Sequence, residues 1–117
     1  MHCFDLAAIG LHLASVHTGA GYNDFNPGLY VEGRCGFLGG VYYNSYRRAS
    51  AQVAWRGEPR KVPLFIELGL ATGYPGHAVE PYAMAGLRMG PVRLGVVPHV
   101  PGLNRTVVVH AMVQLRL

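Results

Sequence analysis

The sequence has 117 residues and a mass of 12.7 kDa, which is enough for one domain with a modest core and too little for two. Half of the residues are hydrophobic and 14% are charged, which excludes an intrinsically disordered chain. The net charge of +4 and the pI near 9.4 indicate only a weak preference for anionic partners. We therefore expect one folded, sparsely charged domain spanning residues 1–117.

Turn residues and alternating hydrophobicity predict an all-β chain. Glycine or proline recurs every few residues, and apolar positions have a spacing of two, which indicates strands rather than helices. Between the turn signals, the predicted strands span residues 4–16, 28–33, 37–46, 49–56, 63–72, 79–88, 92–99 and 106–117.

Short connectors between these strands favour antiparallel neighbours. The absence of long crossovers favours a single up-and-down barrel of about eight strands over a sandwich, because closure also leaves no exposed sheet edge. An even number of strands places both termini at one rim and the connectors 17–27, 44–50, 73–78 and 100–105 at the other. Cys3 and Cys35 lie near the termini rim, where a disulfide is compatible with the layout although strand register does not force one.

The two faces of the predicted strands differ in chemistry. One face is continuously apolar, as in Leu64, Ile66, Leu68 and Leu70, and the first and last strands repeat this pattern. The other face is small, mixed and polar. In a soluble barrel the apolar face points inward, whereas in a membrane barrel it meets lipid and the polar set fills the interior. The low charge content favours the membrane type slightly.

Strand length and the start of the chain count against that preference. Membrane strands need about 9–11 residues, and the predicted strands 28–33 and 92–99 are short. The first residues show no basic region and no cleavage site typical of a signal peptide. We expect an outer-membrane location if the chain is a mature exported form, and a cytoplasmic one if it is complete as given.

Two segments carry a family resemblance. Asn26-Pro27-Gly28-Leu29 and Tyr42-Tyr43-Asn44-Ser45, with the Thr72-Gly73-Tyr74 turn, resemble small uncharacterised proteins of bacteriophages and proteobacteria. The resemblance covers most of the chain from Tyr22 and implies an exported barrel with no established activity, although this chain shows no leader. The overall pattern is also loosely similar to small outer-membrane barrels, but no catalytic motif of their lipid-modifying members matches here.

One set of polar residues is predicted to share the barrel interior. A histidine near a carboxylate can act as a general base, and His12, Glu67 and His110 are a permissible metal trio, although no spacing supports one. Mutual hydrogen bonding of packed interior groups explains the same residues better. We therefore predict no catalytic residue, metal or cofactor, and a polar interior cluster that offers a ligand site: His12, Asn44, Gln52, Glu67, Arg93, His110 and Gln114.

Aromatic and basic residues mark the rim opposite the termini. Stacking and guanidinium contacts there would suit phosphate, sugar or nucleic acid, but an interfacial aromatic girdle or a simple hairpin turn explains the residues better. These rim residues are Tyr42, Tyr43, Tyr46, Arg47 and Arg48. A second basic patch of Arg56, Arg60 and Lys61 falls at the other rim, so no continuous nucleic-acid stripe forms.

Three functional hypotheses follow. The first is a non-enzymatic phage or bacterial barrel of the outer-membrane type, whose loops contact a surface, membrane lipid or a host protein. The second is a soluble barrel that binds a small or anionic ligand or a host protein. The third is a lipid-modifying enzyme, which would need His12 or His110 to reach its substrate. Nucleic acid is not an expected partner.

Overall fold

The structure is a computed structural model that describes residues 3, 5–17, 25–44, 46–73, 76, 78–97 and 107–117. None of these residues lies in a helix, so none belongs to a helix that could cross a membrane. The eight strands are β1 Leu6–His17, β2 Phe25–Gly33, β3 Phe37–Tyr43, β4 Ala49–Gly57, β5 Leu64–Ala71, β6 Glu80–Met89, β7 Val92–Val97 and β8 Val108–Arg116.

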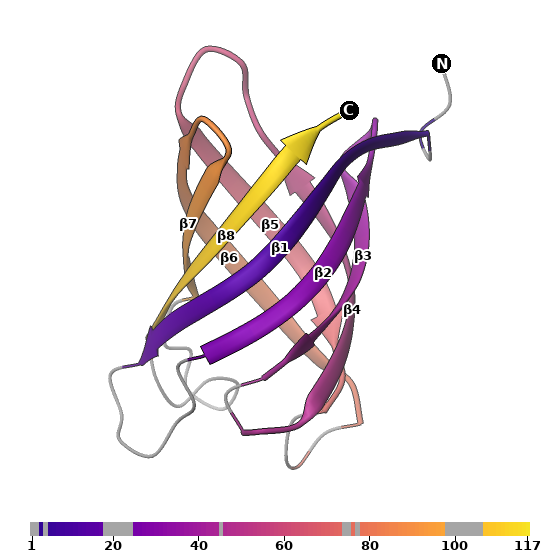
Figure 1. Cartoon of the computed structure of the whole chain (residues 1–117), viewed down its shortest axis with the longest axis vertical. Helices are drawn as coiled ribbons and strands as arrows, with labels where there is room; N and C mark the ends of the chain where they lie inside the picture. Colours follow the sequence, from indigo (N-terminus) through magenta and orange to yellow (C-terminus); the bar gives the residue numbers. More distant parts are fainter. Residues whose placement is uncertain are drawn as a thin grey trace.

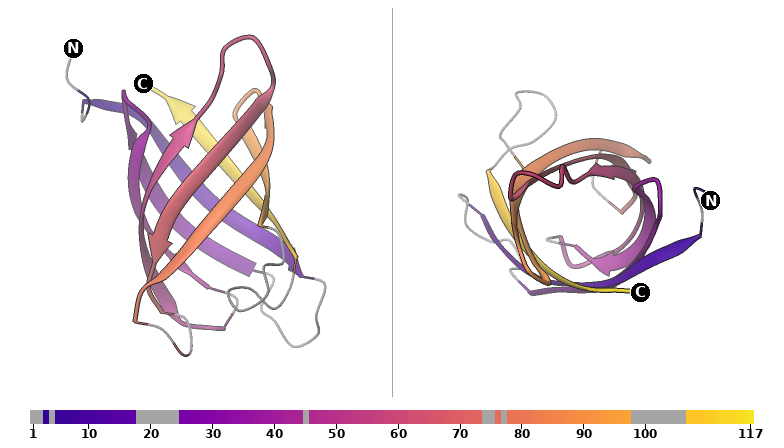
Figure 2. Two further views of the ribbon diagram at one scale, coloured as in Figure 1. Left: turned by 180° about the vertical axis from the view of Figure 1, so that it is seen from behind. Right: turned by 90° about the horizontal axis from the view of Figure 1, so that it is seen from above.

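The strands form one closed antiparallel barrel. Each strand pairs with the next in the sequence, and β1 pairs with β8 to close the wall (Figures 1 and 2). The strand β1 begins and β8 ends at the same end of the barrel, where the Leu117 N–H donates a hydrogen bond to the Ala7 carbonyl at 2.8 Å (Figure 1). The predicted all-β, eight-stranded up-and-down barrel is therefore confirmed.

The second strand is longer than predicted. It begins at Phe25 rather than Gly28, and its register with β1 shifts between His12 and Ala14, opposite residues 25–28. A proline lacks an N–H, so Pro27 fits within this irregular part of the ladder instead of ending the strand. The strand β7 is short as predicted, with six described residues, and the expected strand ends at Phe4, His99 and Thr106 lie outside the described residues.

Large side chains fill the middle of the barrel. Tyr30, Phe65, Met84 and Met112 form its buried apolar cluster. Inward-facing glycine makes room for them: a Cβ atom at Gly10 would lie 2.0 Å from Cζ of Tyr30, far inside van der Waals contact. The interior is therefore a packed core around polar groups rather than an open tube.

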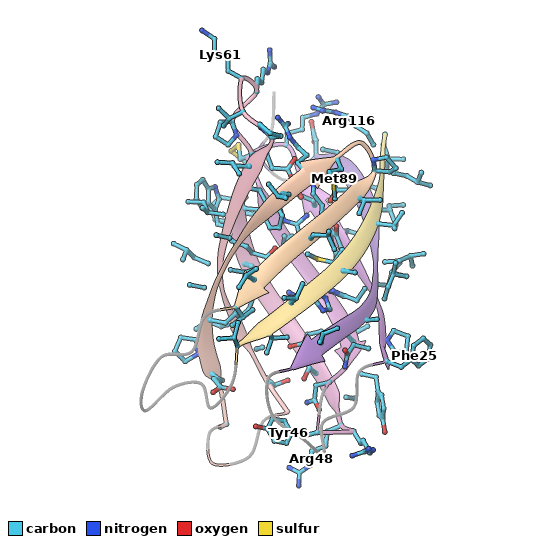
Figure 3. The ribbon with its side chains drawn as sticks, turned by 90° about the vertical axis from the view of Figure 1, so that its left-hand side faces the viewer. Phe25, Tyr46, Arg48, Lys61, Met89 and Arg116 are labelled. Carbon is cyan, nitrogen blue, oxygen red and sulfur yellow. A yellow bond between two sulfur atoms is a disulfide. The ribbon has the colours of Figure 1, made fainter. Side chains whose placement is uncertain are left out.

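The outer wall is apolar. Side chains project from it on all sides, with Phe25 outside one end of the wall and Met89 near the other (Figure 3). The charged residues of the described strands all fall on the inward-pointing alternation: Glu32, Arg56, Glu67, Glu80, Arg88, Arg93 and Arg116. The large, exposed outward residues are Ile9, Leu11, Leu13, Val16, Phe25, Leu29, Val31, Phe37, Val41, Tyr43, Val53, Trp55, Leu64, Ile66, Leu68, Leu70, Leu87, Met89, Val96, Val109 and Leu115.

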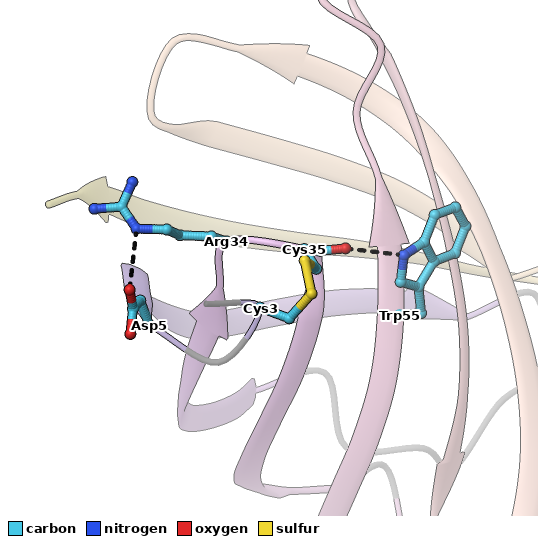
Figure 4. The surroundings of a disulfide bond; sticks show 5 residues. All are labelled: Cys3, Asp5, Arg34, Cys35 and Trp55. Carbon is cyan, nitrogen blue, oxygen red and sulfur yellow. Dashed lines mark hydrogen bonds and ion pairs between the residues drawn. A yellow bond between two sulfur atoms is a disulfide. The ribbon is translucent and has the colours of Figure 1, made fainter. Parts of the chain in front are cut away.

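A disulfide joins the N-terminal segment to the β2–β3 turn. The bond links Cys3 to Cys35, and Trp55 Nε1 donates to the Cys35 carbonyl at 3.1 Å (Figure 4). Beside them, Arg34 and Asp5 form an exposed ion pair at 3.9 Å. The pairing that strand layout allowed is thus present in the folded chain.

Candidate functional site

A buried ion pair lies at the centre of the barrel interior. Arg56 on β4 and Glu67 on β5 are 3% and 1% exposed, and they are directly opposite in the strand register. Arg56 donates from Nε and Nη2 to Glu67 Oε1 at 2.9 and 2.7 Å. Its Nη1 donates to Gln114 Oε1 at 2.7 Å and to the Tyr30 hydroxyl at 3.1 Å. The guanidinium is thus surrounded by acceptors, which a buried charge requires.

A chain of hydrogen bonds continues from this ion pair across the barrel. The Tyr82 hydroxyl donates to Glu67 Oε2 at 2.5 Å and accepts from Gln52 Nε2 at 2.7 Å. His12 Nε2 donates to Gln52 Oε1 at 2.5 Å. In neutral His12, Nδ1 then accepts from His110 Nε2 at 2.9 Å. Five strands, β1, β4, β5, β6 and β8, contribute to this part of the network.

The network is saturated. Among the described residues, no buried side-chain nitrogen or oxygen lacks a hydrogen-bond partner. Glu67 reaches His12 only through Tyr82 and Gln52, and the described part of the chain holds no group of three metal-ligating side chains. Of the permissible trio His12, Glu67 and His110, only the two histidines are in direct contact, at 2.9 Å. The arrangement stabilises the interior, and it leaves neither histidine on the outward face.

Two residues predicted for the interior cluster lie elsewhere. Arg93 is buried near the termini rim, where Nε and Nη2 donate to the two carboxylate oxygens of Glu58 at 2.9 and 3.0 Å. Asn44 is buried at the opposite rim, in the turn after β3. The seven predicted residues are thus distributed along the barrel axis, and only His12, Gln52, Glu67, His110 and Gln114 belong to the central network.

Asn44 organises the rim opposite the termini. Its Oδ1 accepts from the N–H groups of Tyr46 and Arg48 at 2.8 and 3.1 Å, and its Nδ2 donates to Ser50 Oγ and to the Gly73 carbonyl. Asparagine suits such a turn because its side chain mimics a backbone acceptor. The turn projects Tyr46 and Arg48 from the end of the barrel (Figure 3).

Of the five predicted rim residues, four are exposed and one faces inward. Tyr43, Tyr46, Arg47 and Arg48 are exposed at this rim. Tyr42 instead shares the inward alternation, with its ring centroid 5.1 Å from that of His12. Strand parity explains the difference, because consecutive residues of β3 point to opposite faces.

The sequence motifs with a family resemblance meet at this same rim. Asn26 Nδ2 donates to the Tyr43 carbonyl at 3.1 Å, and Asn44 Nδ2 donates to the Gly73 carbonyl at 2.8 Å. These asparagines and the Thr-Gly turn therefore tie β2, β3 and the end of β5 together. Their role in the structure is to hold the rim.

Sequence reasoning missed the largest interior groups. Arg56 was expected in a rim patch with Arg60 and Lys61, but it is buried and pairs with Glu67. The signal was available: Gln52 and Arg56 are four residues apart on one strand and so share a face. The same parity places Tyr30 and Tyr82 inside.

Electrostatics at the termini rim centre on Glu58, which follows β4. Burial alone would raise the pKa of this carboxyl. The hydrogen bonds and charge of Arg93, with the nearby charges of Arg56 and Arg88, outweigh burial and hold the pKa of Glu58 below its ordinary value. Glu58 is therefore a carboxylate at neutral pH, and it neutralises one of the guanidinium groups at this end.

No protein-family model matches this sequence, and no curated protein matches it significantly. The resemblance to small phage and proteobacterial proteins stays a prediction.

Proposed function

We propose that this chain is a non-enzymatic membrane barrel of the outer-membrane type, whose rim opposite the termini contacts a surface or host partner. The observation that carries the proposal is the reversed chemistry of the wall. Every charged residue of the described strands points inward, and large apolar side chains cover the outside. In water such a continuous apolar surface would drive association, whereas in lipid it is the favourable exterior.

The interior supports the same assignment. A charge in a barrel surrounded by hydrocarbon must be paired and hydrogen-bonded, and Arg56 meets both conditions through Glu67, Gln114 and Tyr30. The pairing of β1 with β8 closes the wall, so the backbone N–H and C=O groups of these two strands have hydrogen-bond partners. A bilayer requires this because its core offers no water to bind them.

Aromatic residues near the two ends of the wall add a second line of support. Phe25 and Tyr43 are exposed towards the loop end, and Phe37 and Trp55 are paired and exposed towards the termini end. Aromatic side chains at these two levels are typical of the girdles of membrane barrels. The apolar residues between them would lie at the level of the acyl chains.

The disulfide supports an exported chain, and the position of the two tightest turns supports the orientation. Disulfides persist in oxidising compartments, and in outer-membrane barrels the termini and short turns face the periplasm. Here Cys3–Cys35 lies at the termini end, with the tight turns at residues 34–36 and 90–91. The Asn44-centred turn would then face outward from the cell and present Tyr46, Arg47 and Arg48.

The chain contains one tryptophan, which makes the proposal directly testable. Trp55 lies on the outer wall, so its fluorescence in bilayers should be quenched most by lipids brominated near the headgroup. A Trp55→Phe/Val53→Trp variant moves the probe two residues deeper on the same face and should shift the maximum towards chains brominated further down. A barrel that stays monodisperse without detergent, with Trp55 insensitive to brominated lipid, would contradict membrane insertion.

Orientation and loop exposure need a cellular test. An epitope inserted after Arg47 should bind antibody on intact bacteria that express the exported chain. The same epitope inserted at Gly90, in the β6–β7 turn, should bind only after the outer membrane is permeabilised. Equal labelling of both sites on intact cells would remove the surface role of the rim.

A further inference from the structure

The positive charge of the chain is concentrated at the termini end of the barrel. An open cavity of about 910 Å³ lies there. Its lining holds seven Lys or Arg residues and two Glu residues, a net charge of +5, against +4 for the whole chain. We call this cavity the cationic vestibule; its charged lining is Arg34, Arg56, Arg60, Lys61, Arg88, Arg93, Arg116, Glu32 and Glu58.

Some of these cations are already used by the fold. Arg56 binds Glu67 beneath the vestibule, and Arg93 binds Glu58 through two hydrogen bonds. Arg88 Nη2 donates to the carbonyls of Pro59 and Val62 at 2.8 and 2.9 Å. These three guanidinium groups therefore hold the wall and the loop of the vestibule in place.

Three other cations of the cationic vestibule are not held by carboxylates. Arg60, Lys61 and Arg116 form no ion pair with any residue that the structure describes. Figure 3 shows Lys61 and Arg116 at the open end, on the β4–β5 loop and at the end of β8. Because Arg88 binds the carbonyls on both sides of Arg60 and Lys61, the loop that carries them is fixed before any ligand arrives.

We propose that the cationic vestibule binds a soluble anion with several phosphate-type charges. Arg60 and Lys61 come from the β4–β5 loop and Arg116 from the end of β8. Cations that reach one opening from two elements suit an elongated anion better than a single phosphate. Arginine matches phosphate oxygens through its planar fork, and lysine adds a point charge. These exposed cations border an opening that faces water, with Lys61 on a loop that projects beyond the wall (Figure 3), whereas lipid headgroups would meet the outside of the wall; we therefore assign a soluble anion as the ligand. This site lies at the opposite end from the proposed surface rim and does not depend on lipid insertion.

The test uses inorganic tripolyphosphate and the folded full chain in a nonionic detergent at low salt. Calorimetry should detect binding at the wild-type vestibule. An Arg60→Gln/Lys61→Gln variant should raise Kd about tenfold, because two charged contacts are lost. The matched control is Arg47→Gln/Arg48→Gln, which removes the same charge from an adjacent pair at the other rim and should change Kd less than about twofold.

The possible results divide cleanly. Equal weakening by both double variants would reduce the effect to net charge and overturn the site, as would no tripolyphosphate binding by a barrel whose circular dichroism shows the folded state. Mixed micelles containing phosphatidylglycerol distinguish the source of the phosphate. If they leave tripolyphosphate binding intact, the soluble anion is supported. If they abolish it, the vestibule belongs to lipid headgroups and the proposal fails.

Discussion

The interior and the outer wall of this barrel reverse the usual arrangement of a water-soluble domain. Inside, Arg56 and Glu67 are charged and almost fully buried, and they are joined by directional hydrogen bonds. Outside, Leu68 and its neighbours on β5 are exposed, and their side chains need no hydrogen-bond partner. The inside is therefore sensitive to the loss of a single partner, and the outside is sensitive to the solvent. Each of the following changes tests one side of this comparison.

The largest effect is expected inside, where a buried charge can lose its shortest ion pair. Glu67→Met should lower the free energy of unfolding by about 3 kcal/mol, because Arg56 stays buried and charged and keeps only its longer ion pairs with Glu32 and Glu58, at 3.4 and 3.9 Å. The double variant Arg56→Met/Glu67→Met should lose less than Glu67→Met alone, since Tyr30 still bonds to Gln114 and Tyr82 to Gln52. Urea titrations of the folded barrel measure both. The single variant Arg56→Met completes the comparison. If the loss of unfolding free energy in the double variant equals the sum of the losses for Arg56→Met and Glu67→Met, the two charges act independently.

A charge placed on the outer wall tests the solvent. Leu68 is 53% exposed in the middle of β5, and Leu68→Arg should lower the free energy of unfolding in lipid vesicles by about 2–4 kcal/mol. Val62→Arg, in the β4–β5 loop, should cost less than about 1 kcal/mol because it lies beyond the hydrocarbon. If Leu68→Arg is as harmless as Val62→Arg, the wall does not face lipid.

Space inside the barrel gives a smaller effect. Gly10→Ala would place a methyl group against the ring of Tyr30, and we expect a loss of about 1–3 kcal/mol as the ring is displaced. Gly39→Ala is the matched control, because its Cβ atom would meet only the Gln52 carbonyl at 3.7 Å. Thermal unfolding should separate the two variants, and similar melting temperatures would mean that Tyr30 has room to move.

The smallest effect concerns pH at the termini rim. The pKa of Glu58 is lower in the folded chain than its ordinary value, so its ion pair with Arg93 stabilises the fold above that ordinary value. The stability is lost as the pH falls through the folded-state pKa. At pH 7, Glu58→Gln should cost about 1 kcal/mol, and the difference from wild type should vanish in acid. A difference that is constant from pH 7 to pH 3 would contradict this linkage.

The barrel could be predicted from the sequence because strand alternation and short turns act locally. Parity alone also placed His12, Gln52, Glu67 and Gln114 on the inward face. It could not assign their depth, which depends on how far each strand is staggered against its neighbour, so Asn44 and Arg93 were grouped with residues near the middle.

The sequence also could not decide whether the apolar face points into the barrel or out of it. The alternation is identical for a barrel with its apolar face inside or outside, and only the volume of the interior side chains separates them. Tyr30, Phe65 and Met112 fill the interior when the polar face points inward, and the glycine at position 10 is what admits the Tyr30 ring. A large side chain on one strand thus packs against a glycine on another strand. The pattern of residues along a single strand carries no information about such a pair.

The hydrogen bond from the Leu117 N–H to the Ala7 carbonyl places the end of β8 beside the start of β1. The β1–β8 pair is antiparallel like the pairs that turns connect, and its register shift between His12 and Ala14 also occurs between β1 and β2. A linker could join the end of β8 to the start of β1, and new ends could be opened in the β6–β7 turn without changing a strand neighbour. The order of the strands along the chain would change while each strand kept its two neighbours, so the arrangement of the wall does not require β1 to be synthesised first.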